Sequence, residues 1–142
     1  MEQKTSLNEE SATIFDTKLL MITSAFFLGL MGIAGSFLPE EILALYTFKI
    51  NTMSVLLVKI TGALYLGFAV LNWMARGNII GGIYSRPVAL GNFFHFTIIA
   101  ITLLKLTITN QATTLFITGG LLYSIFAISF GYILFAGGKS CA

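Results

Sequence analysis

The sequence predicts an all-α membrane protein, a bundle of four transmembrane helices formed by one domain over residues 1–142. Of these residues, 56% are hydrophobic and 10% are charged, whereas a soluble domain carries about 25% charged residues. So few charges cannot cover a globular surface, and the expected solvent is therefore lipid. Each of four apolar runs has about the 20 residues that a helix needs to cross a bilayer. Backbone groups in hydrocarbon must pair within their own segment, and the chain has no room for a closed barrel, so each run should be helical.

The predicted order of elements begins with a polar N-terminal segment over residues 1–16, which is either a tail or a short interfacial helix. The four spans follow at about 17–37, 54–75, 87–106 and 113–136. Between the first two spans, Pro39 followed by Glu40 and Glu41 predicts a short helix. Proline suits the first helical turn, and acidic side chains suit the positive end of the helix dipole. We expect this short helix to lie at the membrane interface.

Lysine and arginine near the span ends predict the orientation, because cytoplasmic loops carry an excess of these residues. Five of them fall on one side of the bilayer: Lys4, Lys18, Arg76, Arg86 and Lys139. Three fall on the other side: Lys49, Lys59 and Lys105. The difference favours both termini in the cytoplasm, and we expect the protein in a bacterial inner membrane.

Small residues spaced four apart mark the faces on which helices could touch, because such spacing lets two backbones approach closely. The pairs are Ala25 and Gly29, Gly32 and Ser36, Ala63 and Gly67, Gly120 and Ser124, and Ala127 and Gly131. They predict a compact four-helix bundle. The same pairs would also suit the interface of a homodimer, and the sequence does not separate the two interpretations.

A faint internal repeat also runs through the chain. Residues 62–69 match residues 120–127 at five of eight positions, including Tyr65 and Tyr123. Phe26 and Phe27 in the first span are echoed by Phe93 and Phe94 in the third. This pattern is consistent with two duplicated helical hairpins.

Several kinds of chemistry are disfavoured by what the spans lack. No aspartate or glutamate lies inside a predicted span, which argues against ion-coupled transport through a membrane carboxylate and against carboxylate acid–base catalysis. The chain has one histidine and one cysteine, so we expect no metal and no other cofactor. Its net charge of +2 is too small and too dispersed to suggest a nucleic-acid partner.

The polar side chains that remain gather at the end of the second span and the start of the third. Asn72 and Arg76 are four residues apart and share a helix face, as do Asn92 and His95, which are three apart. We call the candidate ligand-binding residues the polar cluster: Tyr65, Asn72, Arg76, Arg86, Asn92 and His95. They predict one pocket in the cytoplasmic half of the bundle. No residue is assigned a catalytic role.

Each member of the polar cluster also has a plain structural interpretation. His95 is either an imidazole hydrogen-bonded to a neighbouring helix, or a group that binds a ligand or transfers a proton. Arg76 and Arg86 either set the topology and contact lipid phosphates, or clamp the anionic head of a lipid or other ligand through their guanidinium forks.

The sequence also resembles the small four-helix membrane proteins grouped as DoxX-like. The resemblance covers most of the chain and rests on glycine-and-apolar patterns: residues 62–68, Trp73, Arg76, Gly77, Arg86, Pro87 and the segment 35–40. It implies a four-helix bundle with a cavity opening between the helices. Some members of that group are similar to subunits of quinone-linked oxidoreductases, and members with known ligand sites use intramembrane acids. This chain has no such acid, so no functional residue is carried over from the group.

The function that we expect is non-catalytic. The protein would bind a lipid-like or hydrophobic ligand, or serve as an accessory subunit of a membrane complex. The expected partners are membrane lipids and either a second copy of the chain or a larger membrane complex. One alternative is a quinone-linked or lipid-modifying enzyme centred on His95. A second alternative is a small transporter or channel built by oligomerisation.

Overall fold

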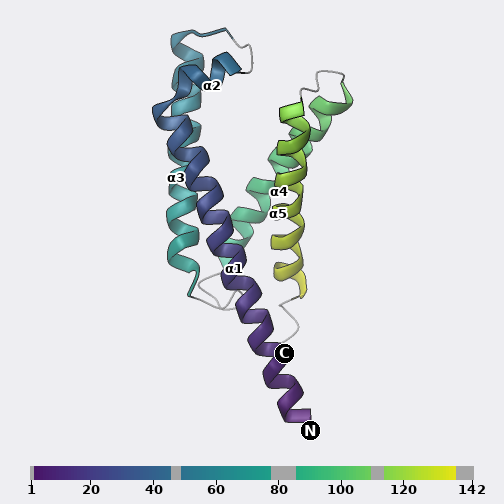
Figure 1. Cartoon of the computed structure of the whole chain (residues 1–142). Coiled ribbons are helices and arrows are strands. Elements are labelled where there is room, and N and C mark those ends of the chain that lie inside the picture. The colour runs from purple at the N-terminus through teal and green to yellow at the C-terminus, as the bar shows by residue number, and fades with distance from the viewer. Residues whose placement is uncertain (1, 46–48, 78–85, 110–113, 137–142) are drawn as a thin grey trace. The chain divides into compact units, whose positions relative to one another are not determined.

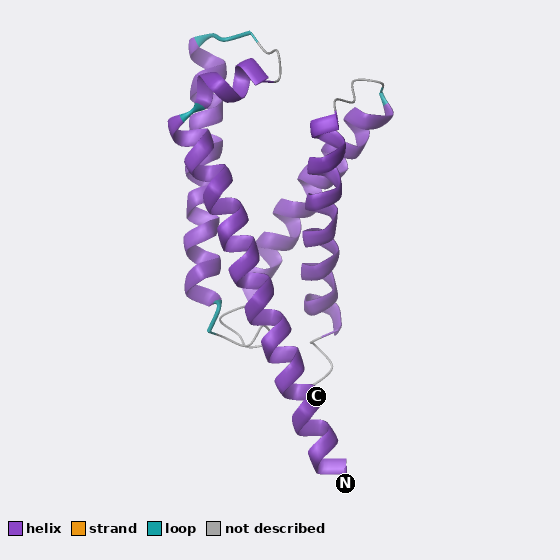
Figure 2. Ribbon diagram, viewed as in Figure 1, coloured by secondary structure: helices purple, strands orange, loops and turns teal. Residues whose placement is uncertain are grey.

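The computed structural model describes residues 2–45, 49–77, 86–109 and 114–136, with side chains from residue 17 to residue 135 (Figure 1). In this part of the chain there are five helices and no strand (Figure 2). The helices are α1 (Glu2–Phe37), α2 (Pro39–Leu45), α3 (Thr52–Ala75), α4 (Arg86–Ile108) and α5 (Thr114–Ala136). The predicted all-α class is therefore confirmed. Lys4 and Lys139, which contributed to the predicted orientation, lie outside the described side chains.

Four of these helices are long and apolar enough to cross a membrane. The qualifying stretches are Thr17–Phe37, Thr52–Ala75, Arg86–Ile108 and Thr114–Phe135. Each agrees with a predicted span to within two residues. A stretch of 21 residues rises about 32 Å at 1.5 Å per residue, which matches the roughly 30 Å of a bilayer core.

Helix α1 differs from expectation at its beginning. We predicted a polar tail or a separate short interfacial helix over residues 1–16, but one helix starts at Glu2 and continues without a break to Phe37. The reason is local: residues 2–16 contain no glycine or proline, and several of them are good helix formers such as glutamate, lysine, leucine and alanine.

Two local sequence features fix where α2 and α3 begin. Pro39 begins α2, as predicted, and Glu40 and Glu41 lie in its first turn. At the start of α3 the Asn51 side chain accepts a hydrogen bond from the Ser54 backbone N–H (2.8 Å), and the Ser54 hydroxyl accepts one from the Asn51 backbone N–H (3.1 Å). This reciprocal capping box satisfies two backbone donors, and it explains why α3 begins at Thr52 instead of residue 54.

The structure divides into two compact units, residues 19–77 and residues 1–18 with 78–142, and each is described by itself. In the first unit, α1 and α3 run antiparallel. Small residues allow close contact: a Cβ added to Gly32 would lie 2.7 Å from the Leu66 backbone nitrogen, and one added to Gly62 would lie 2.6 Å from the Ser36 backbone nitrogen. The predicted contact role of Gly32 and Ser36 is confirmed.

The second unit contains the antiparallel pair of α4 and α5, whose contact includes stacked aromatic side chains. Phe96 is fully buried and stacks on Phe126 and Phe130, with ring centroids 4.8 and 5.7 Å apart. Gly131 lies under the Phe93 ring, since an added Cβ would be 3.0 Å from Phe93 Cε2. Here too the small residues of α5 face the partner helix.

The two helix pairs pack in the same register. Gly62 contacts α1, and its counterpart in the repeat, Gly120, contacts Leu103 of α4. If the repeat is extended beyond residue 69 at the same offset, Trp73 corresponds to Gly131. Phe26 contacts Trp73, while Phe93, the counterpart of Phe26, lies over Gly131. This shared register supports the interpretation as two duplicated helical hairpins.

Candidate functional site

The six residues of the polar cluster belong to two helices. Tyr65, Asn72 and Arg76 lie on α3, whereas Arg86, Asn92 and His95 lie on α4. The two helices belong to different units, so the contacts of each set are described within its own helix pair.

Asn72 joins α3 to α1 through a buried hydrogen bond. Its Nδ2 donates to the Ser24 hydroxyl at 3.0 Å, and that hydroxyl donates in turn to the Met21 carbonyl oxygen at 3.0 Å. Asn72, Ser24 and Met21 are all fully buried. A polar side chain at membrane depth needs such partners, and this bond satisfies part of the Asn72 amide inside the protein.

The Asn72–Ser24 bond should stabilise the α1–α3 pair. We expect Asn72→Val, which removes the amide with only a modest change in volume, to lower the free energy of unfolding in mixed micelles by about 1 kcal/mol, the size of interhelical hydrogen bonds in membranes. The control is Thr61→Val, since the exposed Thr61 hydroxyl bonds to the Leu57 carbonyl oxygen of its own helix. Equal stability of the Asn72 variant and the native protein would contradict this structural role.

Arg76 lies at the C-terminal end of α3 and is held by Trp73. The guanidinium carbon lies 3.8 Å from the centroid of the indole ring, and Nη1 donates to the Trp73 carbonyl oxygen at 2.8 Å. The bond satisfies one of the last carbonyl groups of the helix, which have no partner within it. Tyr65, like Arg76, is half-buried.

On α4, the members of the polar cluster differ in burial. Asn92 is fully buried, and its Nδ2 donates to the Val88 carbonyl oxygen at 2.9 Å. His95 is half-buried beside Phe96 and Tyr123, with ring centroids 5.3 and 6.3 Å away. Arg86 is exposed at the first residue of the helix. The aromatic surroundings of His95 come from α4 itself and from α5.

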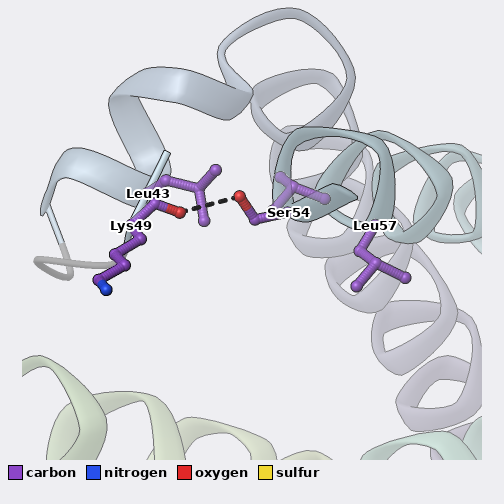
Figure 3. A pocket seen from close by; sticks show the side chains of 5 residues that line it. Leu43, Lys49, Ser54 and Leu57 are labelled. Atoms are coloured by element: carbon purple, nitrogen blue, oxygen red, sulfur yellow. Dashed lines mark hydrogen bonds between the residues drawn. The ribbon is translucent and has the colours of Figure 1, made fainter. Parts of the chain in front are cut away.

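A cavity at the α2–α3 corner was not predicted from the sequence. It is a shallow depression that is largely open to the surroundings, with a volume of about 510 Å³; its lining residues are Leu43, Lys49, Ser54, Leu57 and Val58 (Figure 3). None of the polar cluster lines it. The signal that could have located the corner is the sequence Asn51–Ser54, whose capping box fixes the start of α3.

The polar groups of this cavity come from Ser54 and Lys49. The Ser54 hydroxyl donates to the Lys49 carbonyl oxygen at 3.0 Å, which is the dashed line in Figure 3. The Lys49 side chain extends away from Ser54 and Leu57 in the same view and is exposed. The cavity therefore combines aliphatic walls with one cation at its rim.

Taken with the four apolar helices, these features are compatible with an integral membrane protein of helical type. No protein-family model, no curated protein and no solved structure matches the chain. Membership of the DoxX-like group stays a prediction.

Proposed function

We propose that this chain is a small, non-catalytic integral membrane protein of a bacterial inner membrane that binds a lipid-like ligand. It would do so by itself or as an accessory subunit of a membrane complex. Both termini are assigned to the cytoplasm, as the distribution of lysine and arginine favours.

The observation that carries the proposal is the open and mainly apolar cavity at the α2–α3 corner. Leu43, Leu57 and Val58 supply its apolar walls, and Lys49 supplies a positive charge at its rim. Ligand sites are commonly 300–1,000 Å³ and mostly apolar, with a few polar groups that orient the ligand. A volume of about 510 Å³ suits part of an acyl chain, and the lysine suits the polar end of the same molecule.

Filling this cavity should reduce lipid binding. We expect Leu57→Trp to lower the amount of lipid retained per protein by about fivefold, equivalent to about 1 kcal/mol, because roughly 40 Å² of apolar contact is lost. The measurement is mass spectrometry of the lipid bound after the purified protein is delipidated and supplied again with membrane lipid extract.

The matched control is Leu56→Trp. Leu56 precedes Leu57 on α3, has a similar exposed fraction (50% against 56%), and does not line the cavity. It should retain lipid as the native protein does. If the native protein retains no lipid, or if both variants retain lipid equally well, the proposed function is wrong.

A further inference from the structure

The guanidinium group of Arg76, at the C-terminal end of α3, is held in place by neighbouring side chains. Arg76 lies over the Trp73 indole at 3.8 Å and is tied to the Trp73 carbonyl oxygen. The indole is in turn contacted edge-on by Phe26 of α1, at a centroid distance of 5.9 Å and an interplanar angle of 88°. We call these three residues the Phe26–Trp73–Arg76 stack. Contacts on two sides restrain the indole, and the indole restrains the guanidinium.

The stack is accessible from outside the protein. Phe26 is 60% exposed and Trp73 is 45% exposed. A guanidinium has five N–H donors, and the bond to Trp73 uses one. Among the described residues the guanidinium has no further hydrogen-bond partner, so its remaining donors and its positive charge can bind an anion.

No carboxylate in the described part of this unit is placed to neutralise Arg76. The acids with described side chains are Glu40 and Glu41, which lie in the first turn of α2. Helix α2 packs at the other end of α3, where Leu43 lines a cavity with Ser54 and Leu57. The 24 residues of α3 separate its two ends by about 36 Å, which is far beyond the reach of an ion pair.

The position of the stack along α3 indicates what it meets in a membrane. A helix of about 36 Å exceeds the roughly 30 Å hydrocarbon core, so its final residue lies at the level of the lipid head groups. Tryptophan and arginine are typical of that level. The anionic group found there is the lipid phosphate, and the planar guanidinium fork matches its oxygen atoms.

We propose that the Phe26–Trp73–Arg76 stack binds the phosphate of an anionic phospholipid, with an acyl chain lying against Phe26. This inference rests on the proposed function, since it names the class of lipid and a second place where it binds. Aromatic contact fixes the guanidinium before the lipid arrives, so less side-chain freedom is lost on binding.

Trp73 is the only tryptophan of the chain, so its fluorescence reports directly on this site. The protein is reconstituted in phosphatidylcholine vesicles that contain a small fraction of phosphatidylglycerol with brominated acyl chains, which quench tryptophan on contact. We expect quenching well above that caused by the same fraction of brominated phosphatidylcholine. Arg76→Gln should weaken the preference for phosphatidylglycerol about tenfold, as expected for loss of a charge-assisted hydrogen bond.

Two further variants distinguish the effect of the planar guanidinium group from the effect of its positive charge. Arg76→Lys keeps the charge but loses the fork, and it should show an intermediate preference. Lys59→Gln removes one exposed charge from the same helix and should quench as the native protein does. Arg76→Lys also serves if Arg76→Gln fails to fold: a lysine variant with undiminished preference would then overturn the inference.

Two further measurements show whether a negative result contradicts this inference or the proposed function. Addition of inorganic phosphate should leave the quenching unchanged; if phosphate relieves it, the site binds free phosphate and the inference is wrong. Equal quenching by the two brominated lipids would also overturn the inference. In that case the proposed function would still hold, provided that mass spectrometry shows lipid retained by the native protein. If the native protein retains no lipid in that measurement, the proposed function itself is wrong.

Discussion

The variant Phe96→Ala is expected to lose about 3 kcal/mol of unfolding free energy, the lower end of the range for buried phenylalanine. Phe96 is 0% exposed, and its ring stacks on Phe126 and Phe130 of α5 at interplanar angles of 21° and 13°. Lipid tails are as apolar as the protein interior, so the loss arises from missing dispersion contacts around the cavity that the variant leaves. Reversible unfolding in mixed micelles measures it.

The control for this variant lies on the same helix. Phe94 is 54% exposed, so Phe94→Ala removes the same ring from a surface that lipid can cover. We expect a change within about 0.5 kcal/mol, as for other surface substitutions. Similar losses for the two variants would show that Phe96 does not form the core of the α4–α5 pair.

The second large effect is expected at Gly62, where a single added carbon has no room. A Cβ at this position would lie 2.6 Å from the Ser36 backbone nitrogen and 2.7 Å from the Gly35 carbonyl carbon. Backbone atoms cannot rotate away as a side chain can, so Gly62→Ala must push α1 and α3 apart. We expect a loss of about 2–3 kcal/mol, typical of overpacking, measured by the same unfolding assay.

Gly67 provides the matched control on the same helix. A Cβ added there meets nothing within 4 Å, so Gly67→Ala makes no clash. Because alanine is favoured over glycine in a helix interior by about 1 kcal/mol, the variant should be as stable as the native protein or slightly more so. If Gly67→Ala is the more damaging of the two, α3 packs through the other face.

The comparison of these two glycines also corrects a prediction. The spacing of Ala63 and Gly67 marked a contact face, but both residues are exposed in the structure. The contact is made instead by Gly62, against Gly35 and Ser36. Spacing of four identifies a face that can admit another helix, and it does not say whether a helix is there.

The polar cluster shows the same limit of sequence reasoning. The sequence indicated that Asn72 and Arg76 are set apart from their apolar neighbours, and each has a defined partner, in Ser24 and in Trp73. Neither partner could be predicted, because Ser24 comes from another helix and the indole position depends on its side-chain rotamer. The pocket predicted around the six residues stays a prediction, and the cavity at the α2–α3 corner was missed.

The number and approximate bounds of the four membrane-crossing stretches follow from the sequence alone, although the full length of α1 does not. A helix in lipid pairs its own backbone groups, and lipid accepts any apolar side chain, so both properties depend on local sequence alone. The face through which each helix packs depends instead on its contacts with other helices. In a soluble helix an apolar stripe marks the buried side, but here exposed positions such as Leu64 and Ile125 are as apolar as buried ones such as Leu28. The glycine contacts, the arginine–tryptophan stack and the corner cavity follow from that choice of faces.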